Sequence, residues 1–316
     1  MDLDVKHKDI QFGLCCMNCC LRCQKPPIFC GRSIILKTIH LKGIDELKRR
    51  AIQNLTDLKY IIQWNYENNI HVYRLSSDMF PHMSNPSIPL YSFDFAIPLL
   101  KESAQLAKKY GQRLTFHPSQ YNNLGSPKQD VIDKTIIELN RHSEIMDIME
   151  LDHNSVMVIH GGGIYGNKKE AISRFKQNFY LLNLSTQKRL VLENCEKSYS
   201  TQDCLEICNA LNIPMVFDTH HYVCYNLLHK NITQLSPQEL IPQILQTWEK
   251  RNIKPKFHVS EQGNGRIGHH SDYIENIPDY LLEIPKKYGV KIDIMIEAKM
   301  KEMAIQKLVL KYNDIL

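Results

Sequence analysis

The chain has 316 residues, with 39 Lys and Arg against 34 Asp and Glu, which gives a formal net charge of +5 at pH 7. A hydrophobic share of 43% and a charged share of 23% are typical of a globular protein, and the mild positive charge permits an anionic partner without establishing one. No apolar run reaches the roughly 18 residues of a membrane span, and the opening residues MDLDVKHKDI lack the apolar segment of a secretory signal. We therefore expect an intracellular protein, in cytoplasm or nucleus, that is not secreted, has no membrane partner and acts as a monomer.

Strand-like and helix-like runs alternate along the chain. The strand-like runs cover residues 11–15, 71–77, 113–118, 155–162, 189–195, 214–221, 256–261 and 291–299. The helix-like runs cover residues 43–68, 93–110, 130–150, 168–183, 201–211, 237–250, 271–287 and 301–312. The strands are rich in Val, Ile and Leu and show little alternation, which is typical of parallel strands covered on both faces.

This order of elements predicts a single-domain TIM (β/α)8 barrel over residues 1–316. Eight βα units in about 300 residues match that fold in number and in length. A doubly wound open sheet is the alternative, but it would place a glycine-rich phosphate-binding turn after the first strand. The residues at that position, GLCCMN, do not match such a turn.

Six of the ten cysteines lie within the first thirty residues, in CCMNCCLRC and at Cys30. Two CxxC pairs in this segment have a spacing that can serve a zinc site. The segment lacks a well-separated second pair, so we favour reduced thiols over a structural metal. Disulfides are not expected in a reducing compartment.

The strand-like runs from the third to the eighth each carry a histidine or an acidic residue at or near their end. These residues are His117, His160, Glu193, Asp218 with His221, His258 and Glu297. In a TIM barrel all strands end on one face, so we expect these side chains to converge there. A lone histidine is more often structural, but a series on consecutive strands favours a shared site.

Such a cluster points to metal ions. Carboxylates gathered in one place repel each other or become protonated, and divalent cations remove this penalty while also binding neutral imidazoles. The cluster exceeds what one ion can use, so it predicts two or three metals, with Mn or Zn favoured over Mg by the ligand types. Sites with several metal ions suit the in-line attack of water on a phosphodiester.

Short motifs lie on these strands and on the loops after them. They are YRLSSDMFPH (73–82), TFHPSQYNNL (115–124), VIHGGG (158–163), LVLENCE (190–196), FDTHH (217–221), KFHVSEQ (256–262), HHSDYI (269–274) and IMIEAKMKE (294–302). Together and in this order they resemble the UV damage endonucleases, a family of DNA repair enzymes. The resemblance covers almost the whole chain and implies a TIM barrel, similar to that of the endonuclease IV group, with metal ions at the strand ends.

The resemblance also implies the metal ligands and the ions. The ligands would be His82, His117, His160, Glu193, Asp218, His221, His258, His270 and Glu297. Glu193 would bridge two ions. Some relatives have the histidine that corresponds to His82 three residues later in the sequence, where this chain has Asn85. Three divalent ions are implied, with Mn as the first choice and Mg, Zn or Co as alternatives.

Catalytic roles are implied for Glu193, Lys256 and His258. Lys256 matches a lysine of the family that resembles a residue carboxylated near the metals. The alternative is that Lys256 carries an ordinary ammonium group that contacts phosphate. Lys256 and His258 lie two residues apart on one strand, so their side chains share a face. His220 comes directly before a ligand on the expected strand, so it should point to the other side and be structural.

The implied partner is double-stranded DNA that carries UV lesions. Gln120 and Tyr121 resemble family residues that enter the duplex where damaged bases leave the stack. Leu14 stands where the family often has a lesion-facing tyrosine, so an apolar contact is expected without stacking. Arg74 and Lys299 are candidates for contacts with phosphate or with the metal shell.

We therefore predict a metal-dependent DNA repair endonuclease that nicks DNA 5′ to cyclobutane pyrimidine dimers and 6-4 photoproducts, and also at other distorting lesions. An endonuclease IV-like apurinic/apyrimidinic endonuclease is the nearest alternative. A sugar isomerase would share the barrel, but such sites are richer in carboxylates and need no loop like HPSQYNN. A non-catalytic damage-binding protein would require a broken set of ligands.

Overall fold

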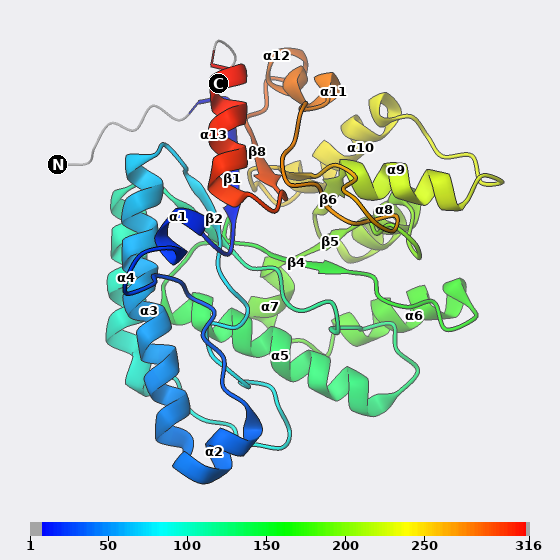
Figure 1. Ribbon diagram of the computed structural model, residues 1–316. Helices are drawn as coiled ribbons and strands as arrows, with labels where there is room; N and C mark the ends of the chain where they lie inside the picture. Colours follow the sequence, from blue (N-terminus) through cyan, green and yellow to red (C-terminus); the bar gives the residue numbers. More distant parts are fainter. Residues whose placement is uncertain (1–7, 314–316) are drawn as a thin grey trace.

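Parallel strands form the centre of the structure, a computed structural model that describes residues 8–313 (Figure 1). The strands are β1 (Ile10–Cys15), β2 (Val72–Arg74), β3 (Arg113–Thr115), β4 (Met157–His160), β5 (Leu190–Glu193), β6 (Met215–Asp218), β7 (Lys256–Val259) and β8 (Ile292–Ile296). They are hydrogen-bonded in the order β3-β2-β1-β8-β7-β6-β5-β4. An isolated parallel bridge between Phe116 and Met157 joins β3 to β4, so the sheet forms a nearly closed barrel. The predicted TIM-barrel fold is confirmed, although residues 1–7 and 314–316 of the predicted domain lie outside the described residues.

Helices surround the barrel (Figure 1). They are α1 (Cys19–Arg22), α2 (Leu36–Lys42), α3 (Ile44–Glu67), the 3-10 helix η1 (Asp94–Ala96), α4 (Ile97–Lys109), α5 (Gln129–Ile148), α6 (Lys168–Phe179), α7 (Leu184–Arg189), α8 (Thr201–Leu211), α9 (Thr219–Leu228), α10 (Pro237–Glu249), α11 (Asp279–Leu282), α12 (Ile284–Tyr288) and α13 (Lys301–Lys311). Within residues 8–313, no helix is both long enough and apolar enough to cross a membrane.

Two of the predicted elements differ from the structure. The helix predicted over 271–287 is instead the pair α11 and α12 after an irregular segment. Pro278 caps the first of these short helices and Pro285 lies in the first turn of the second, where a proline ring prevents one continuous helix. The strand predicted over 214–221 ends at Asp218, and the helix α9 begins at the next residue.

The side chains of β1 alternate between the barrel interior and the helix layer. Cys15 packs inside the barrel with Val72 and Met295, and a Cβ atom on Gly13 would lie only 3.0 Å from the Met295 side chain. Leu14 points the other way, into the main core that the sheet shares with the helices, and it is fully buried. The predicted lesion contact of Leu14 is therefore corrected, because strand alternation turns this side chain away from the surface.

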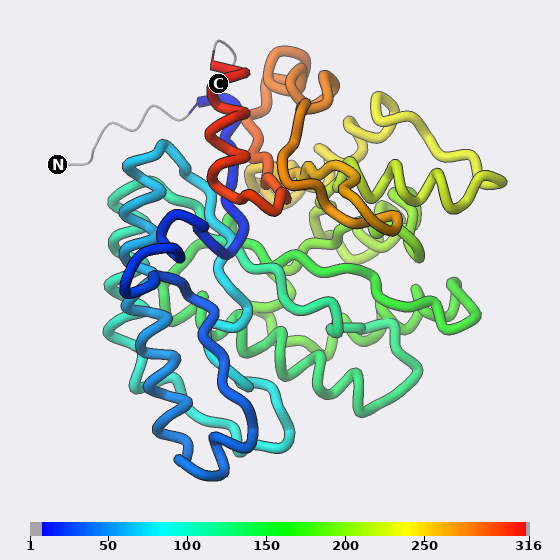
Figure 2. The backbone as a smooth tube through the Cα atoms, viewed as in Figure 1, coloured from blue at the N-terminus to red at the C-terminus, as the bar shows by residue number. Residues whose placement is uncertain are grey.

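The two ends of the described chain lie side by side, as Figure 2 shows. β1 is hydrogen-bonded to β8, and α13 packs against β1. The buried carboxylate of Glu302 in α13 accepts hydrogen bonds at 2.8 Å from the backbone N–H groups of Cys19 and Cys20 in α1. All ten cysteines are free, and among the described residues none belongs to a group of potential metal ligands.

A buried ionic network closes the barrel at the amino ends of the strands. Arg113 Nη1 donates to Asp293 Oδ2 at 2.7 Å, and Lys254 Nζ donates to the other oxygen of the same carboxylate. Lys254 also donates to Gln11 Oε1 at 2.9 Å. Asp293 is fully buried, so its negative charge is compensated almost entirely by these two cations.

Replacing Asp293 by alanine should lower the free energy of unfolding by about 3–5 kcal/mol, because it leaves two cationic side chains without their buried counter-charge. Chemical denaturation of the parent and the variant measures this difference. Asp45→Asn is the matched control, since Asp45 is an exposed carboxylate that lies 3.7 Å from Lys48 Nζ, and its change should stay within about 0.5 kcal/mol. Equal stability of parent and Asp293→Ala would contradict a structural role for the network.

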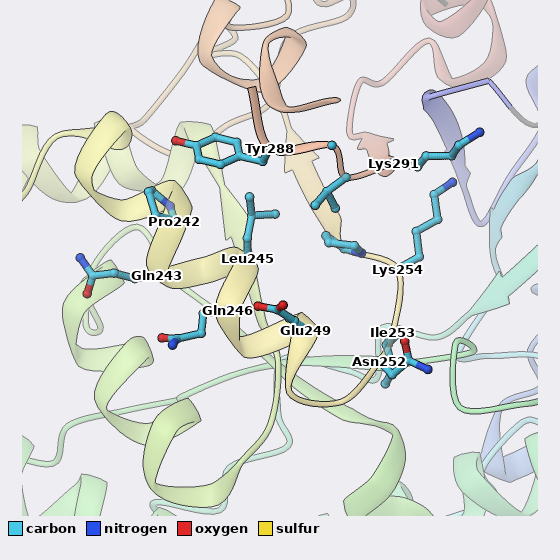
Figure 3. A pocket seen from close by; sticks show the side chains of 13 residues that line it. Pro242, Gln243, Leu245, Gln246, Glu249, Asn252, Ile253, Lys254, Tyr288 and Lys291 are labelled. Carbon is cyan, nitrogen blue, oxygen red and sulfur yellow. The ribbon is translucent and has the colours of Figure 1, made fainter. Parts of the chain in front are cut away.

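A surface cavity of about 750 Å³ lies beside this network (Figure 3). Its lining includes side chains of α10 and the segments that lead into β7 and β8, among them Lys254 and Lys291. The cavity therefore lies at the amino ends of the strands. The residues that sequence analysis assigns to metal binding lie at the opposite, carboxyl ends.

Candidate metal centre

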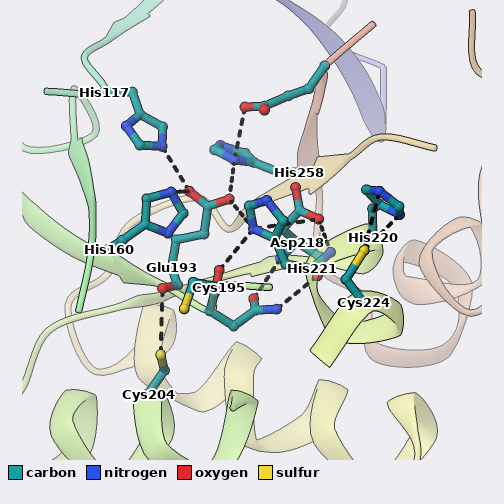
Figure 4. A network of polar contacts seen from close by, with 12 residues as sticks. His117, His160, Glu193, Cys195, Cys204, Asp218, His220, His221, Cys224 and His258 are labelled. Carbon is teal, nitrogen blue, oxygen red and sulfur yellow. Dashed lines mark hydrogen bonds and ion pairs between the residues drawn. The ribbon is translucent and has the colours of Figure 1, made fainter. Parts of the chain in front are cut away.

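Glu193, the last residue of β5, lies at the centre of the predicted ligands and is fully buried (Figure 4). Its Oε2 atom lies 3.0 Å from His117 Nε2 and 3.7 Å from His160 Nε2. Its Oε1 atom lies 3.0 Å from His258 Nδ1 and 3.5 Å from His221 Nδ1. One carboxylate thus contacts imidazoles from four other segments, with each oxygen facing a different pair. This arrangement fits a carboxylate that is shared between two cations.

Glu297 follows β8 and provides a second carboxylate on the same face. Its Oε1 atom lies 3.3 Å from His258 Nδ1 and accepts a hydrogen bond from Arg74 Nη1 at 2.5 Å. Its Oε2 atom lies 3.9 Å from His270 Nδ1. Arg74 is largely buried and also lies 3.4 Å from the thiol of Cys16. The guanidinium group that was a candidate for DNA contact therefore serves here as a counter-charge for Glu297.

Asp218 ends β6 and is also the N-cap residue of α9. Its Oδ1 atom accepts a hydrogen bond from the backbone N–H of His221 at 2.7 Å, which is the usual role of an aspartate at a helix start. Its Oδ2 atom is buried and forms no hydrogen bond within the part of the chain that the structure describes. A buried oxygen without a partner is a suitable ligand atom for a cation.

The neighbouring Asn194 fixes the end of β6. Its Oδ1 atom accepts a hydrogen bond from the backbone N–H of Asp218 at 2.8 Å, and its amide group donates to the carbonyl oxygen of the same residue at 3.0 Å. Asn194 is buried, and sequence analysis did not assign it a role. The signal that could have found it is its place directly after Glu193 in the LVLENCE motif.

His220 and His221 lie in the first turn of α9 and not on a strand. The argument from strand alternation for His220 is therefore corrected, because adjacent residues of a helix diverge by about 100° around its axis. His221 turns toward Glu193 and Asp218, whereas His220 contacts the Cys224 thiol one turn further along the helix (Figure 4).

Lys256 and His258 point to the same side of β7, as their spacing predicts. Lys256 Nζ lies 3.0 Å from His258 Nε2, and both side chains are fully buried. Burial, together with the nearby Arg74 guanidinium, lowers the pKa of Lys256 to about 8. Part of the Lys256 population would therefore carry a neutral amine near neutral pH, which is the form that can be carboxylated.

Burial and the surrounding charges set the protonation of the imidazoles. Burial lowers the pKa of His160 and of His258 to about 4, so both rings are neutral near pH 7 and can act as metal ligands. Burial opposes a charge on His221 as well, but the Asp218 and Glu193 carboxylates outweigh it and raise the pKa of His221 to about 9. A proton on His221 therefore balances part of the negative charge that a divalent cation would balance.

The potential ligand atoms form three overlapping groups, each with its atoms within 4.8 Å of one another. The groups are His117 with His160 and Glu193, Glu193 with Asp218 and His221, and Asp218 with His258 and Glu297. Glu193 and Asp218 each belong to two groups. The donor set of imidazoles and carboxylates fits divalent cations, and these buried residues could hold them.

Two of the predicted ligands lie outside these groups. His270, on the loop after β7, lies 3.9 Å from Glu297 through Nδ1. His82 lies 2.5 Å from the carbonyl oxygen of Ile34 through Nε2 and 3.0 Å from the Asn85 amide through Nδ1. One ring nitrogen is therefore engaged by the segment before α2 and the other within the loop after β2. The prediction of His82 as a ligand is corrected, because its two ring nitrogens contact Ile34 and Asn85 and it belongs to none of the ligand groups found among the described residues.

The predicted DNA-contacting residues of the loop after β3 are exposed. Gln120 and Tyr121 lie at its tip, with 77% of the Tyr121 surface accessible. Behind them, the buried Asn122 donates to the carbonyl oxygen of Ser119 at 2.9 Å and to Glu138 at 2.8 Å. An exposed aromatic side chain therefore stands on an internally hydrogen-bonded loop. Lys299 is also exposed, 3.8 Å from the Asp272 carboxylate.

The fold and the site together define a class of protein: a TIM barrel whose strands carry a buried histidine–carboxylate centre at their carboxyl ends, with the chemistry of a divalent-metal site. A family model described as UV-endonuclease UvdE matches residues 10–315. The chain belongs to the UV-damage endonuclease family.

Two relatives and one solved structure show how far the similarity extends. The chain is 39% identical over 312 residues to a protein of Acanthamoeba polyphaga mimivirus whose name describes a UV-damage endonuclease, with 97% of this chain and 92% of the other covered. It is 37% identical over 314 residues to the UV-damage endonuclease of Schizosaccharomyces pombe, covering 96% of this chain but only 51% of that protein. The crystal structure of SacUVDE superimposes with a TM-score of 0.82 at 27% identity, over 97% of this chain and 99% of the other.

Proposed function

We propose that this protein nicks double-stranded DNA 5′ to UV photoproducts, namely cyclobutane pyrimidine dimers and 6-4 photoproducts, and also at other distorting lesions. The observation that carries the proposal is the sharing of Glu193 and Asp218 between neighbouring groups of ligands, which joins the groups into one centre. Family membership supports a DNA repair endonuclease on independent grounds. We propose that the centre holds three divalent ions, with Mn as the first choice and Mg, Zn or Co as alternatives.

When bound, such cations would supply an activated water and charge stabilisation for in-line displacement at phosphorus. The residues of this chain have separate tasks around that chemistry. Glu193 and Asp218 hold their ligand atoms in fixed places, since both are fully buried. Asn194 also accepts a hydrogen bond from the backbone N–H of Asp218, which fixes the end of β6. Arg74 keeps Glu297 oriented, and Lys256 stands beside His258 with a lowered pKa.

Recognition of damage would come from the exposed side chains at the same end of the barrel. A flat aromatic ring such as Tyr121 and an amide such as Gln120 can fill the gap that forms when damaged bases leave the stack. A step that carries a photoproduct is already distorted, so it costs less free energy to open than an intact step. The proposed specificity therefore rests on deformability of the DNA and not on reading of base edges. Membership of the UV-damage endonuclease family supports this function over an apurinic/apyrimidinic endonuclease.

A nicking assay on one defined duplex tests the proposal. A duplex with a single cyclobutane dimer should be cut 5′ to the dimer in the presence of Mn²⁺, and addition of EDTA should reduce cutting below detection because the ligand groups lose their cations. The same duplex without the dimer is the negative control, and a duplex with one abasic site measures the alternative activity. Equal cutting in EDTA by protein shown to be metal-free by elemental analysis would contradict the proposal.

A further inference from the structure

The loop that follows β4 is tightly packed through its glycines. A Cβ atom on Gly161 would lie 2.8 Å from the ring of Tyr199, and one on Gly162 would lie 2.4 Å from the side-chain amide of Asn123. One on Gly163 would lie 3.3 Å from the ring of Tyr165. Because each glycine lacks a Cβ atom, the side chains of Tyr199, Asn123 and Tyr165 can pack directly against the backbone of this loop. Gly161 and Gly162 are therefore required for the packing of this loop.

Asn123 connects this loop to the one that carries Tyr121. It is buried, and its backbone N–H donates to Thr135 Oγ1 at 2.9 Å, which fixes it against α5. Its Nδ2 atom donates to the hydroxyl oxygen of Tyr165 at 2.6 Å. Because the same side chain lies on Gly162, the loops after β3 and β4 are held together at this point.

Tyr165 is held in place and yet exposed. Its hydroxyl group is bound by Asn123 and its ring lies beside Gly163, but 46% of its surface remains accessible. The guanidinium group of Arg174 lies 6.0 Å from the ring centroid and is itself anchored through Nε to the carbonyl oxygen of Gly125 at 2.9 Å. A fixed aromatic ring with a cation beside it therefore stands five residues after the candidate ligand His160.

These features match what single bases and phosphates require of a protein. Every base has an apolar face that stacks on an aromatic ring, and a nearby cation adds attraction to the backbone. A ring whose orientation is already fixed loses little conformational entropy when it makes such a contact. The accessible face of the Tyr165 ring is free to make such a contact.

We propose that Tyr165 is a second DNA-contacting aromatic, which stacks on an unstacked base of the damaged duplex. Asn123 is its positioning residue, which holds the Tyr165 ring through the bond to its hydroxyl group. This inference rests on the proposed function, since it assigns part of the substrate contact to a residue that the resemblance left without a role.

The test compares Tyr165→Ala with Tyr121→Ala and with Tyr180→Ala. Tyr180 is a matched control, because it is 64% exposed but lies after the carboxyl end of α6, toward the amino ends of the strands. Fluorescence anisotropy measures the dissociation constant for a dimer-containing duplex in EDTA, and nicking with Mn²⁺ gives KM and kcat. Thermal unfolding confirms that each variant is folded.

Tyr165→Ala should weaken binding of the dimer duplex by about tenfold, with the loss mainly in KM, as expected for one stacked base. Tyr165→Phe should bind more tightly than Tyr165→Ala, because it keeps the ring and loses only the bond to Asn123. Asn123→Ala should weaken binding as well, and the double variant should be no weaker than Tyr165→Ala, because the two residues act through one contact. Tyr180→Ala should match the parent.

Binding by folded Tyr165→Ala within about twofold of the parent, while Tyr121→Ala loses affinity, would overturn the inference. If Tyr165→Ala is unstable, Tyr165→Leu replaces it, and the same comparison decides. Failure of the parent to nick the dimer duplex would contradict the proposed function instead. In that case the anisotropy measurements still decide whether Tyr165 contacts DNA, because they need no cutting.

Discussion

Replacing Glu193 by glutamine should reduce nicking of a dimer-containing duplex by at least about 1,000-fold, because the change removes the charge that two ligand groups share. Glutamine has nearly the shape of glutamate, so the backbone of β5 should not move. Its amide group, however, would replace one carboxylate oxygen with an NH2 group that faces imidazole nitrogens. A carboxylate spreads one negative charge over two oxygens that can each face a cation, whereas glutamine offers one neutral oxygen.

Binding of the damaged duplex should survive the same change within about threefold, since Glu193 is fully buried and the proposed DNA contacts lie on exposed loops. Nicking rates and anisotropy on one duplex separate the two effects. Glu206→Gln is the matched control, because Glu206 is an exposed carboxylate of α8 that pairs with Lys176, and its loss should leave both measurements unchanged. A Glu193→Gln variant that cuts at the parent rate would show that the site is assigned wrongly.

Asp218→Asn should reduce nicking by about 100-fold or more while leaving the fold nearly as stable as the parent. Asp218 has two roles: its Oδ1 atom caps α9, and its carboxylate belongs to two ligand groups. Its Oδ2 atom is buried and has no hydrogen-bond partner among the described residues. Asparagine can keep the cap, because its carbonyl oxygen accepts the His221 N–H as aspartate does. It cannot supply the second anionic oxygen. Burial raises the pKa of Asp218 to about 7, so ionisation of this carboxyl group costs the folded protein free energy, and the neutral asparagine should not lower its stability.

Asp218→Ala provides the contrast. It removes both roles, so thermal unfolding in EDTA should show a further loss of about 1 kcal/mol relative to Asp218→Asn, the usual contribution of an N-cap. Nicking should be equally low in both variants. If Asp218→Asn retained full activity, Asp218 would be a structural cap only, and the second and third ligand groups would need another shared residue.

Much of the fold could be predicted because its signals are local. A run such as VMVI before His160 is buried on both faces, and a helical run follows it, so each βα unit is visible in a short window of sequence. Once the units are assigned to a barrel, the topology brings all strand ends to one face. His117, Glu193 and Glu297 could therefore be expected to meet, although they lie far apart in the chain.

The direction of individual side chains could not be predicted in this way. His82 and His117 both follow a strand, but His82 contacts the carbonyl oxygen of Ile34 while His117 reaches Glu193. Leu14 was placed by its position in a motif, and the alternation of β1 turns it into the core. The boundary between β6 and α9 decides that His221, one residue from His220, faces the centre.

The sequence by itself determined the barrel and the set of residues at its carboxyl ends, since hydrophobic runs and their spacing fix the strands and the connections fix where they end. Only the tertiary structure decided which atoms meet. The pairing of Arg74 with Glu297 and the bond from Asn123 to Tyr165 join residues from different βα units. Such contacts depend on the exact turn of each loop after its strand, and loop conformation is set by packing against distant segments, which leaves no local pattern in the sequence.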